Sequence, residues 1–205
     1  MEVVRMMASS IGSPVNPNRI ANTFKSVAHI QLSDKTISNY ISFLCDAFIL
    51  NEAMRYDVKG RKYIGTETKY FYEDMGLRNA ILNFRQDEPT HIMENIIYNE
   101  LVARGYRVDV GTVESWITDN DGKRKRVKLE IDFVLNQSGE RIYIQSAYSL
   151  PTLEKQQQEQ RSLVSVNDSF RKIVITADDT KPWTNELGVK FINIWDFLLN
   201  ESLIK

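Results

Sequence analysis

The chain has 205 residues, of which 42% are hydrophobic and 26% charged, and this length suits one large domain or two small ones. No apolar run approaches the roughly 20 residues that span a bilayer. The start of the chain lacks the sustained apolar segment of a signal peptide, so we expect a cytoplasmic protein with no membrane partner. A single cysteine, Cys45, excludes an internal disulfide, and with two histidines it supplies too few ligands for a classical zinc site. The net charge of −1 neither favours nor excludes nucleic-acid binding, which depends on local basic patches.

The first seventy residues predict three helices followed by a β-hairpin. A helix is expected at 2–11 and a second at 17–26, which begins with a capping asparagine and a proline. The third helix is expected at 34–47, after a capping serine. Two strands, at 48–58 and 62–74, join across a turn with glycine at its tip. The apolar side chains expected to face the core of the second and third helices are Ile20, Phe24, Val27, Ile37, Tyr40, Ile41 and Leu44.

Three helices followed by a two-stranded hairpin is the order of a winged helix, in which the third helix usually enters a DNA groove. The outward side chains of this helix are short or basic groups that can contact phosphates and base edges, namely Lys35, Thr36, Ser38 and Asn39. The hairpin turn adds a basic patch of Lys59, Arg61 and Lys62. We therefore expect residues 1–73 to be a DNA-contacting winged-helix domain. The alternative is a small helical packing domain with a solvated face.

Residues 74–205 change to an α/β pattern. After a short helix at 74–82, apolar spacing predicts a helix at 91–105. The elements expected next are strands at 106–117, 127–136 and 141–149, a helix at 153–166, strands at 171–178 and 188–194, and a closing helix at 195–200. Helix, three strands, helix and strand is the core order of the nuclease fold of type II restriction enzymes and Holliday-junction resolvases. The expected fold class is mixed α/β, with a winged helix-turn-helix followed by a restriction-endonuclease-like domain.

Nucleases of this fold hydrolyse phosphodiesters with Mg²⁺, using a carboxylate pair on adjacent strands and a lysine two residues beyond the second carboxylate. Asp132 stands where the first carboxylate belongs, and Glu94 matches a glutamate often found on the first helix. Gln145 replaces the second carboxylate and Ala147 replaces the lysine. An amide is a weak ligand for a hard cation, and alanine cannot stabilise a phosphate. We therefore expect no catalysis, with Glu94 and Asp132 as candidate Mg²⁺ ligands; the alternatives are an exposed Glu94 and an Asp132 paired with the basic hairpin.

A cluster of cations precedes the strand that carries Asp132. Five of six consecutive positions are basic, namely Lys123, Arg124, Lys125, Arg126 and Lys128. Adjacent cations repel one another unless an anion lies near, so nucleic acid is an expected partner, and a solvated loop is the alternative. The tryptophans are expected to pack in the interior and not to stack on bases; they are Trp116, Trp183 and Trp195.

Several ordered segments resemble the C-terminal region of a broad prokaryotic ATPase family: ISNYISFLCDAFIL, KYFYEDMGLRNAI, MENIIYNELVARGYRVDVG, EIDFVLN and IYIQSAYSL. Members of that family join an N-terminal AAA-type ATP-binding domain to a winged helix and an uncharacterised nuclease-like domain. The resemblance covers nearly the entire chain. No Gly-x-x-x-x-Gly-Lys-Ser/Thr phosphate loop occurs in these residues, so it implies ATP binding only through an N-terminal domain outside this chain.

The leading hypothesis is a non-catalytic nucleic-acid-binding or regulatory region whose partners are DNA and its own ATPase domain, with no cofactor in this chain. One alternative is a Mg²⁺-dependent DNA nuclease that uses Glu94 and Asp132. The other is a protein-interaction scaffold for the ATPase or for another protein partner.

Overall fold

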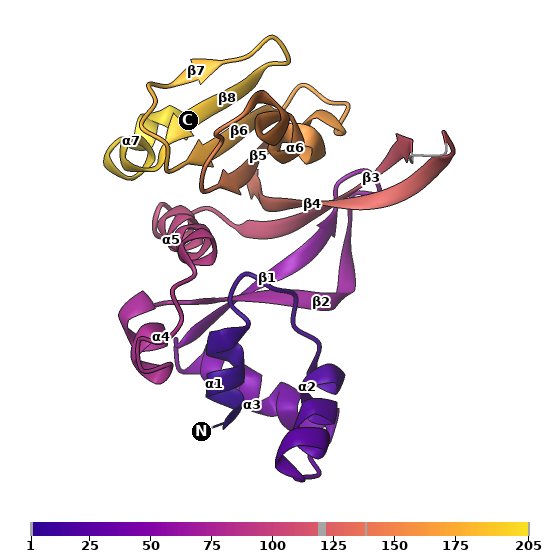
Figure 1. Ribbon diagram of the computed structural model, residues 1–205, viewed down its shortest axis with the longest axis vertical. Coiled ribbons are helices and arrows are strands. Elements are labelled where there is room, and N and C mark those ends of the chain that lie inside the picture. The colour runs from indigo at the N-terminus through magenta and orange to yellow at the C-terminus, as the bar shows by residue number, and fades with distance from the viewer. Residues whose placement is uncertain (1, 119–121, 138, 205) are drawn as a thin grey trace. The chain divides into compact units, whose positions relative to one another are not determined.

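The computed structural model describes residues 2–118, 122–137 and 139–204 (Figure 1). Over these residues the architecture is mixed α/β, with seven α-helices and an eight-stranded mixed sheet. The chain forms two compact units. Unit 1 comprises Met1–Met54 and Gly65–Asn99, and unit 2 comprises Arg55–Ile64 and Glu100–Lys205. The two units therefore alternate along the chain, because the turn end of the first hairpin belongs to unit 2, whereas the sequence predicts one boundary between residues 73 and 74.

Unit 1 contains the helices predicted for the first part of the chain. Its elements are α1 (Glu2–Ser9), α2 (Pro17–Thr23), a π-helical turn (Phe24–Ala28), α3 (Asp34–Asp46), the start of β1 (Leu50–Asp57), the end of β2 (Lys62–Tyr72), α4 (Met75–Ile81) and most of α5 (Pro89–Ala103). The predicted capping is confirmed. The side chain of Asn16 accepts a hydrogen bond from the backbone N–H of Asn18 at 3.0 Å, and that of Ser33 accepts one from Thr36 at 3.0 Å. None of the helices in the described ranges is long and apolar enough to cross a membrane.

Two of the predicted core positions of unit 1 are wrong. Val27 is 75% exposed and Tyr40 is 44% exposed. Val27 lies in the π-helical turn, where i→i+5 bonding changes which residue faces the core. Tyr40 lies beside the stripe of α3 that is buried, so that it borders the core without entering it. Buried as predicted are Ile20, Phe24, Ile37 and Ile41, and Leu44 is half-buried.

Unit 2 is built around the larger part of the sheet. Its elements, after the hairpin turn and the end of α5, are β3 (Val108–Thr118), β4 (Arg124–Gln137), β5 (Glu140–Ala147), α6 (Leu153–Val164), β6 (Arg171–Thr176), β7 (Trp183–Thr184), β8 (Val189–Asn193), α7 (Ile194–Leu199) and a 3₁₀ turn (Glu201–Ile204). All except β7 and the 3₁₀ turn are predicted by the sequence. The two-residue β7 is too short to give an alternating pattern.

The strands follow the order β2-β1-β3-β4-β5-β6-β8-β7. Strands β3, β4 and β5 pair antiparallel, whereas β5, β6 and β8 pair parallel. The turn end of β1 also joins this sheet, because Arg55–Asp57 pair in parallel with Val110–Thr112. Thus the tip of the hairpin expected to act as a wing is held by β3.

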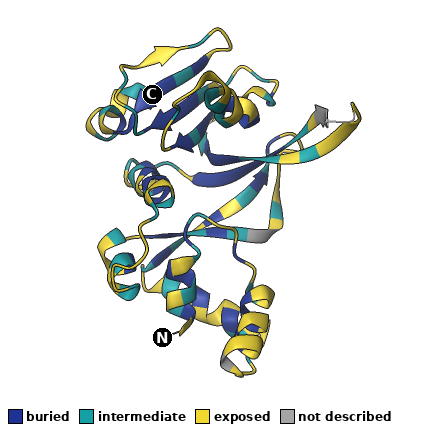
Figure 2. Ribbon diagram, in the orientation of Figure 1, coloured by how far each residue is buried: buried dark blue, intermediate teal, exposed yellow. Residues whose placement is uncertain are grey.

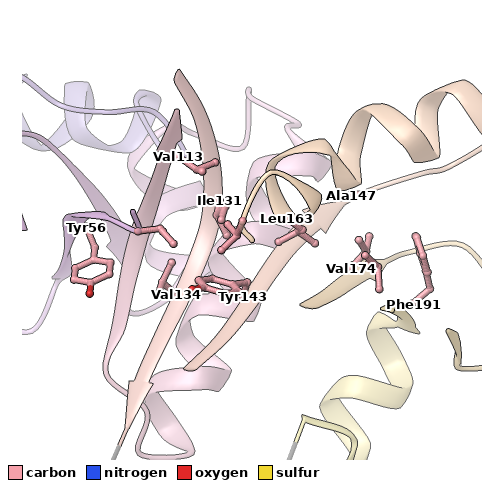
Figure 3. Close-up of a cluster of buried hydrophobic side chains, with 12 residues drawn as sticks. Tyr56, Val113, Ile131, Val134, Tyr143, Ala147, Leu163, Val174 and Phe191 are labelled. Carbon is pink, nitrogen blue, oxygen red and sulfur yellow. The ribbon is translucent and has the colours of Figure 1, made fainter. Parts of the chain in front are cut away.

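One face of the unit 2 sheet packs against α6. Leu163 of α6 contributes to a buried apolar cluster with Tyr143 and Ala147 of β5, Val174 of β6 and Phe191 of β8 (Figure 3). All five side chains are at most 4% exposed. This packing holds the inner strands of the sheet in place.

Strand β4 contains a bulge where it passes Val110 of β3. Gly111 pairs with Ile131 and Asp109 pairs with Val134, so two residues of β4 lie opposite one residue of β3. The bulge brings β4 close to Gly111. A Cβ atom at Gly111 would lie 2.7 Å from Val134 Cγ2 and 2.9 Å from Ile131 Cβ.

The Gly111→Ala variant should lower the free energy of unfolding by roughly 1–3 kcal/mol, because its methyl group must displace buried side chains of β4. Urea unfolding followed by circular dichroism measures this change. Gly65→Ala is the matched control, since nothing lies within 4 Å of a Cβ there. Equal stability of the two variants would contradict the close approach of β3 and β4.

Candidate functional site

The outer parts of β3 and β4 form a two-stranded arm. Strand β1 pairs with β3 only at residues 110–112, and β5 pairs with β4 only at residues 133–137. Residues 113–118 and 124–129, here called the arm, pair with each other in the described ladders. Figure 1 shows both strands continuing side by side beyond their flanking strands, and Figure 2 shows the outer part of β4 exposed.

The arm carries the basic cluster that the sequence predicts to meet nucleic acid. All the cations of the cluster are exposed, namely Lys123, Arg124, Lys125, Arg126 and Lys128. Since strand residues alternate between faces, Arg124, Arg126 and Lys128 share one face of the arm. Glu114 of β3 lies opposite Lys128 on this face and forms an ion pair with Arg126.

The prediction that Trp116 packs in the interior is wrong, because its side chain is 61% exposed. Trp116 lies directly opposite Arg126 in the ladder, on the face that carries the cations. Trp195 is also exposed, at 66%. Trp183 stacks on Phe191, with the ring centroids 4.4 Å apart and the planes at 8°, but it is 41% exposed and does not lie in the interior either. The alternation of β3, which puts Trp116 and Glu114 on one side, was the available signal.

The four predicted groove-contacting residues belong to α3 in unit 1. Lys35, Ser38 and Asn39 are exposed, and Thr36 is half-buried. The hydroxyl of Thr36 lies 2.8 Å from that of Ser33, and Ser38 Oγ donates to the backbone oxygen of Asp34 at 2.9 Å. Both hydroxyls are therefore engaged within the helix, and Lys35 supplies the charge on this surface.

The predicted basic patch at the hairpin turn belongs to unit 2. Lys59 Nζ donates to the backbone oxygen of Glu114 at 2.6 Å, so this cation fastens the turn to β3. Arg61 and Lys62 are exposed. Arg61 has a φ of 51° in the turn.

The side chain of Asp132 lies in the bulge, at the point where β4 and β5 separate. Its Oδ2 accepts a hydrogen bond from Gln145 Nε2 at 2.7 Å and another from the backbone N–H of Ser146 at 2.8 Å. On its other side Gln145 accepts a hydrogen bond from Ser162 Oγ of α6 at 3.1 Å. Gln145 thus links Asp132 to α6, a contact that the sequence pattern does not reveal.

This arrangement does not fit Mg²⁺. The amide N–H of Gln145 points at the carboxylate oxygen that a cation would need, and Ala147 is buried in the apolar cluster beside Leu163. A polar cavity of about 270 Å³ adjoins Gln145 and is lined by Leu129, Glu130, Gln158, Glu159, Arg161 and Ser162. Glu130 forms an ion pair with Arg55, whose Nη2 lies 2.8 Å from its carboxylate. Across the described residues, no three His, Cys, Asp or Glu side chains gather as metal ligands do.

Glu94, the other candidate ligand, belongs to unit 1 and is buried, so the alternative of an exposed Glu94 is wrong. Its Oε1 lies 2.9 Å from Lys69 Nζ, and its Oε2 lies 3.9 Å from His91 Nδ1. Burial raises the pKa of the Glu94 carboxyl, but the Lys69 ammonium and His91 outweigh this effect and hold the pKa below its usual value. Glu94 is therefore an ionised partner of Lys69 at neutral pH.

Unit 1 also carries an apolar groove of about 420 Å³. Its lining includes the exposed side chains of Ile30, Tyr40 and Phe43. Such a surface is compatible with the hypothesis of a protein-interaction scaffold.

The chain resembles proteins whose descriptions state no activity. Residues 1–88 match a family described as a domain of unknown function (DUF8612). An uncharacterized protein of Haemophilus influenzae is 34% identical over 197 residues, covering 96% of this chain and 45% of the relative. The chain therefore spans less than half the length of this curated relative. The crystal structure of protein VC1899 from Vibrio cholerae aligns with 96% of this chain and 52% of its own, at 13% identity and a TM-score of 0.32, which is too low to indicate a common fold.

Gln145→Glu should destabilise unit 2 at neutral pH by about 2 kcal/mol, because it replaces the hydrogen bond to Asp132 by contact between two carboxylates. Thermal unfolding with and without Mg²⁺ measures this, and the cation should restore part of the lost stability. Gln145→Met, which removes the hydrogen bonds without adding charge, should be insensitive to Mg²⁺. A Gln145→Glu variant as stable as the wild type without cation would refute the assigned contact.

Proposed function

We propose that this chain is a non-catalytic nucleic-acid-binding region of a larger AAA-type ATPase, and that the arm makes its main contact with nucleic acid. The observation that carries the proposal is the exposed face of the arm, where Arg124, Arg126 and Lys128 project together. Glu114 is the carboxylate paired with this row, and it engages Arg126. The row therefore retains a positive charge that favours an anionic partner.

The spacing of the row suits a phosphate backbone. Alternate residues of a strand lie about 7 Å apart, so the three cations are spread along one line. Lys and Arg side chains that neutralise phosphates release condensed counterions, and this release drives binding at low salt. Lysine and arginine side chains can extend from such a row to phosphates without any sequence preference.

The distribution of charge favours unit 2 over the predicted recognition helix. Unit 1 carries more acidic than basic side chains, whereas unit 2 carries more basic than acidic ones. The order α1, α2, α3, β1, β2 supports a winged helix as the proposed fold of the first region. On α3, Lys35 is the one cation among the four predicted contact residues, so we assign this helix a secondary role in binding.

The element order α5, β3, β4, β5, α6, β6 supports a nuclease-like fold for the second region. Two observations support the non-catalytic part of the proposal. The amide of Gln145 donates a hydrogen bond to the Asp132 carboxylate, and Ala147 is buried. The attachment to an ATPase is supported by the segments that resemble that family. The greater length of the Haemophilus influenzae relative agrees with it. ATP hydrolysis is then expected from residues outside this chain.

Replacing Arg124, Arg126 and Lys128 together by glutamine should lower the affinity for a fluorescein-labelled DNA oligonucleotide roughly tenfold or more at low salt. It should also reduce the slope of log K against log salt by about 2, since each lost contact with a single strand contributes about 0.7. Fluorescence anisotropy between about 50 and about 200 mM NaCl measures both quantities.

The matched control replaces three exposed cations of the expected winged helix by glutamine, namely Lys35, Arg61 and Lys62. Its affinity should stay within about threefold of the wild type, less than half a decade in K. A larger loss in the control than in the arm variant would assign binding to the winged helix. Absence of binding by the wild type at low salt would sink the proposed function.

No cleavage of single-stranded or duplex DNA is expected with Mg²⁺ or Mn²⁺, because the amide of Gln145 and the methyl group of Ala147 cannot supply the missing carboxylate and lysine. Gel analysis of labelled DNA after prolonged incubation tests this, with Asp132→Ala as the reference for contaminating activity. Cleavage that disappears in Asp132→Ala would show that the chain is a nuclease.

A further inference from the structure

We propose that the arm binds single-stranded nucleic acid, with a base stacked on the indole ring of Trp116. This inference rests on the proposed function and names its substrate class. It starts from the 61% exposure of Trp116 in a regular strand, beside the cations of the arm. An exposed aromatic ring beside a row of cations is the combination that binds single strands elsewhere, with bases stacked on the ring and phosphates held by the cations.

Trp116 has a fixed place relative to the cations. It lies opposite Arg126 in the antiparallel ladder, and directly opposed residues have Cβ atoms about 5 Å apart. Arg124 and Lys128 lie two positions to either side of Arg126 on the same face. A backbone that follows the basic row can therefore place a base over the indole ring while its phosphates meet the flanking cations.

The opposite face of the arm is partly covered. Ser165, at the end of α6, donates a hydrogen bond to Ser115 Oγ at 3.0 Å. Val127, on this covered face, is half-buried. Here one face of the arm near Trp116 is open, which suits a strand lying across it.

Stacking also selects for single strands. In a duplex the faces of the bases are covered by their neighbours, whereas single strands can present them to aromatic side chains. Such stacking strengthens binding by roughly 5- to 150-fold per base. Glu114 also disfavours a duplex. In a duplex groove its carboxylate would lie near the phosphates of two strands, and like charges repel.

The experiment compares single-stranded DNA, single-stranded RNA and duplex DNA of one sequence by fluorescence anisotropy, with the whole chain. The wild type should bind at least one single strand more tightly than the duplex. Trp116→Ala should weaken that binding roughly tenfold or more, and should change duplex binding by less than about twofold. Trp116→Phe, which keeps an aromatic face, should retain much of the single-strand affinity.

Trp195→Ala is the matched control, since Trp195 is exposed to a similar extent but lies on α7. It should bind every probe as the wild type does.

A second measurement follows the tryptophan fluorescence and needs no destabilising variant. Single strands should quench the tryptophan fluorescence of the wild type, and the quenching should be lost in Trp116→Phe while Trp183 and Trp195 remain.

Two outcomes overturn the inference and leave the proposed function intact. One is duplex binding as tight as single-strand binding, with salt dependence from the arm cations. The other is an equal effect of Trp116→Ala on all probes. If no probe binds at low salt, the proposed function itself fails, and the exposed indole then belongs to a protein contact.

Discussion

On the N-terminal side of Phe133, strand β4 no longer pairs with β5, and the backbone N–H of Ser146 needs another acceptor. The carboxylate of Asp132 takes this hydrogen bond and a second one from Gln145. The bulge opposite Val110 aims Asp132 into the gap between the strands. Because Asp132 accepts the hydrogen bond of the Ser146 N–H, β4 can separate from β5 and continue with β3 as the arm. The residue that a nuclease would use to hold a metal stabilises here the base of the arm.

Most of the fold follows from local signals, because helix caps, apolar spacing and strand alternation act over a few residues. The predicted helices and strands are confirmed, and the short β7 was not predicted. Contacts between distant segments could not be predicted in the same way. No local sequence pattern indicates the parallel pairing of Arg55–Asp57 with β3. The same holds for the complete burial of Arg78, whose side chain donates hydrogen bonds to the backbone oxygens of Ala8 and Gln86.

The candidate site was predicted in part. The basic cluster is visible in sequence because its residues are consecutive, and their exposure is confirmed. The exposure of Trp116 was missed, because strand alternation places Trp116 on the face of Glu114 but does not say that neighbouring strands end before this face is covered. Once the strand order is predicted, the sequence shows that Gln145 and Ala147 stand where a nuclease has a carboxylate and a lysine. The bond from Gln145 to Asp132 requires the three-dimensional arrangement of two strands and α6.

The central claim, that the arm is where nucleic acid binds, is tested most directly by photo-crosslinking. A single strand that carries 5-iodouracil, irradiated with the wild-type protein and mapped by mass spectrometry, should attach to Trp116 in the arm. The account predicts crosslinked peptides from residues 113–118, with the yield falling as salt rises. Crosslinks confined to α3 or to the hairpin turn at residues 59–62 would contradict it.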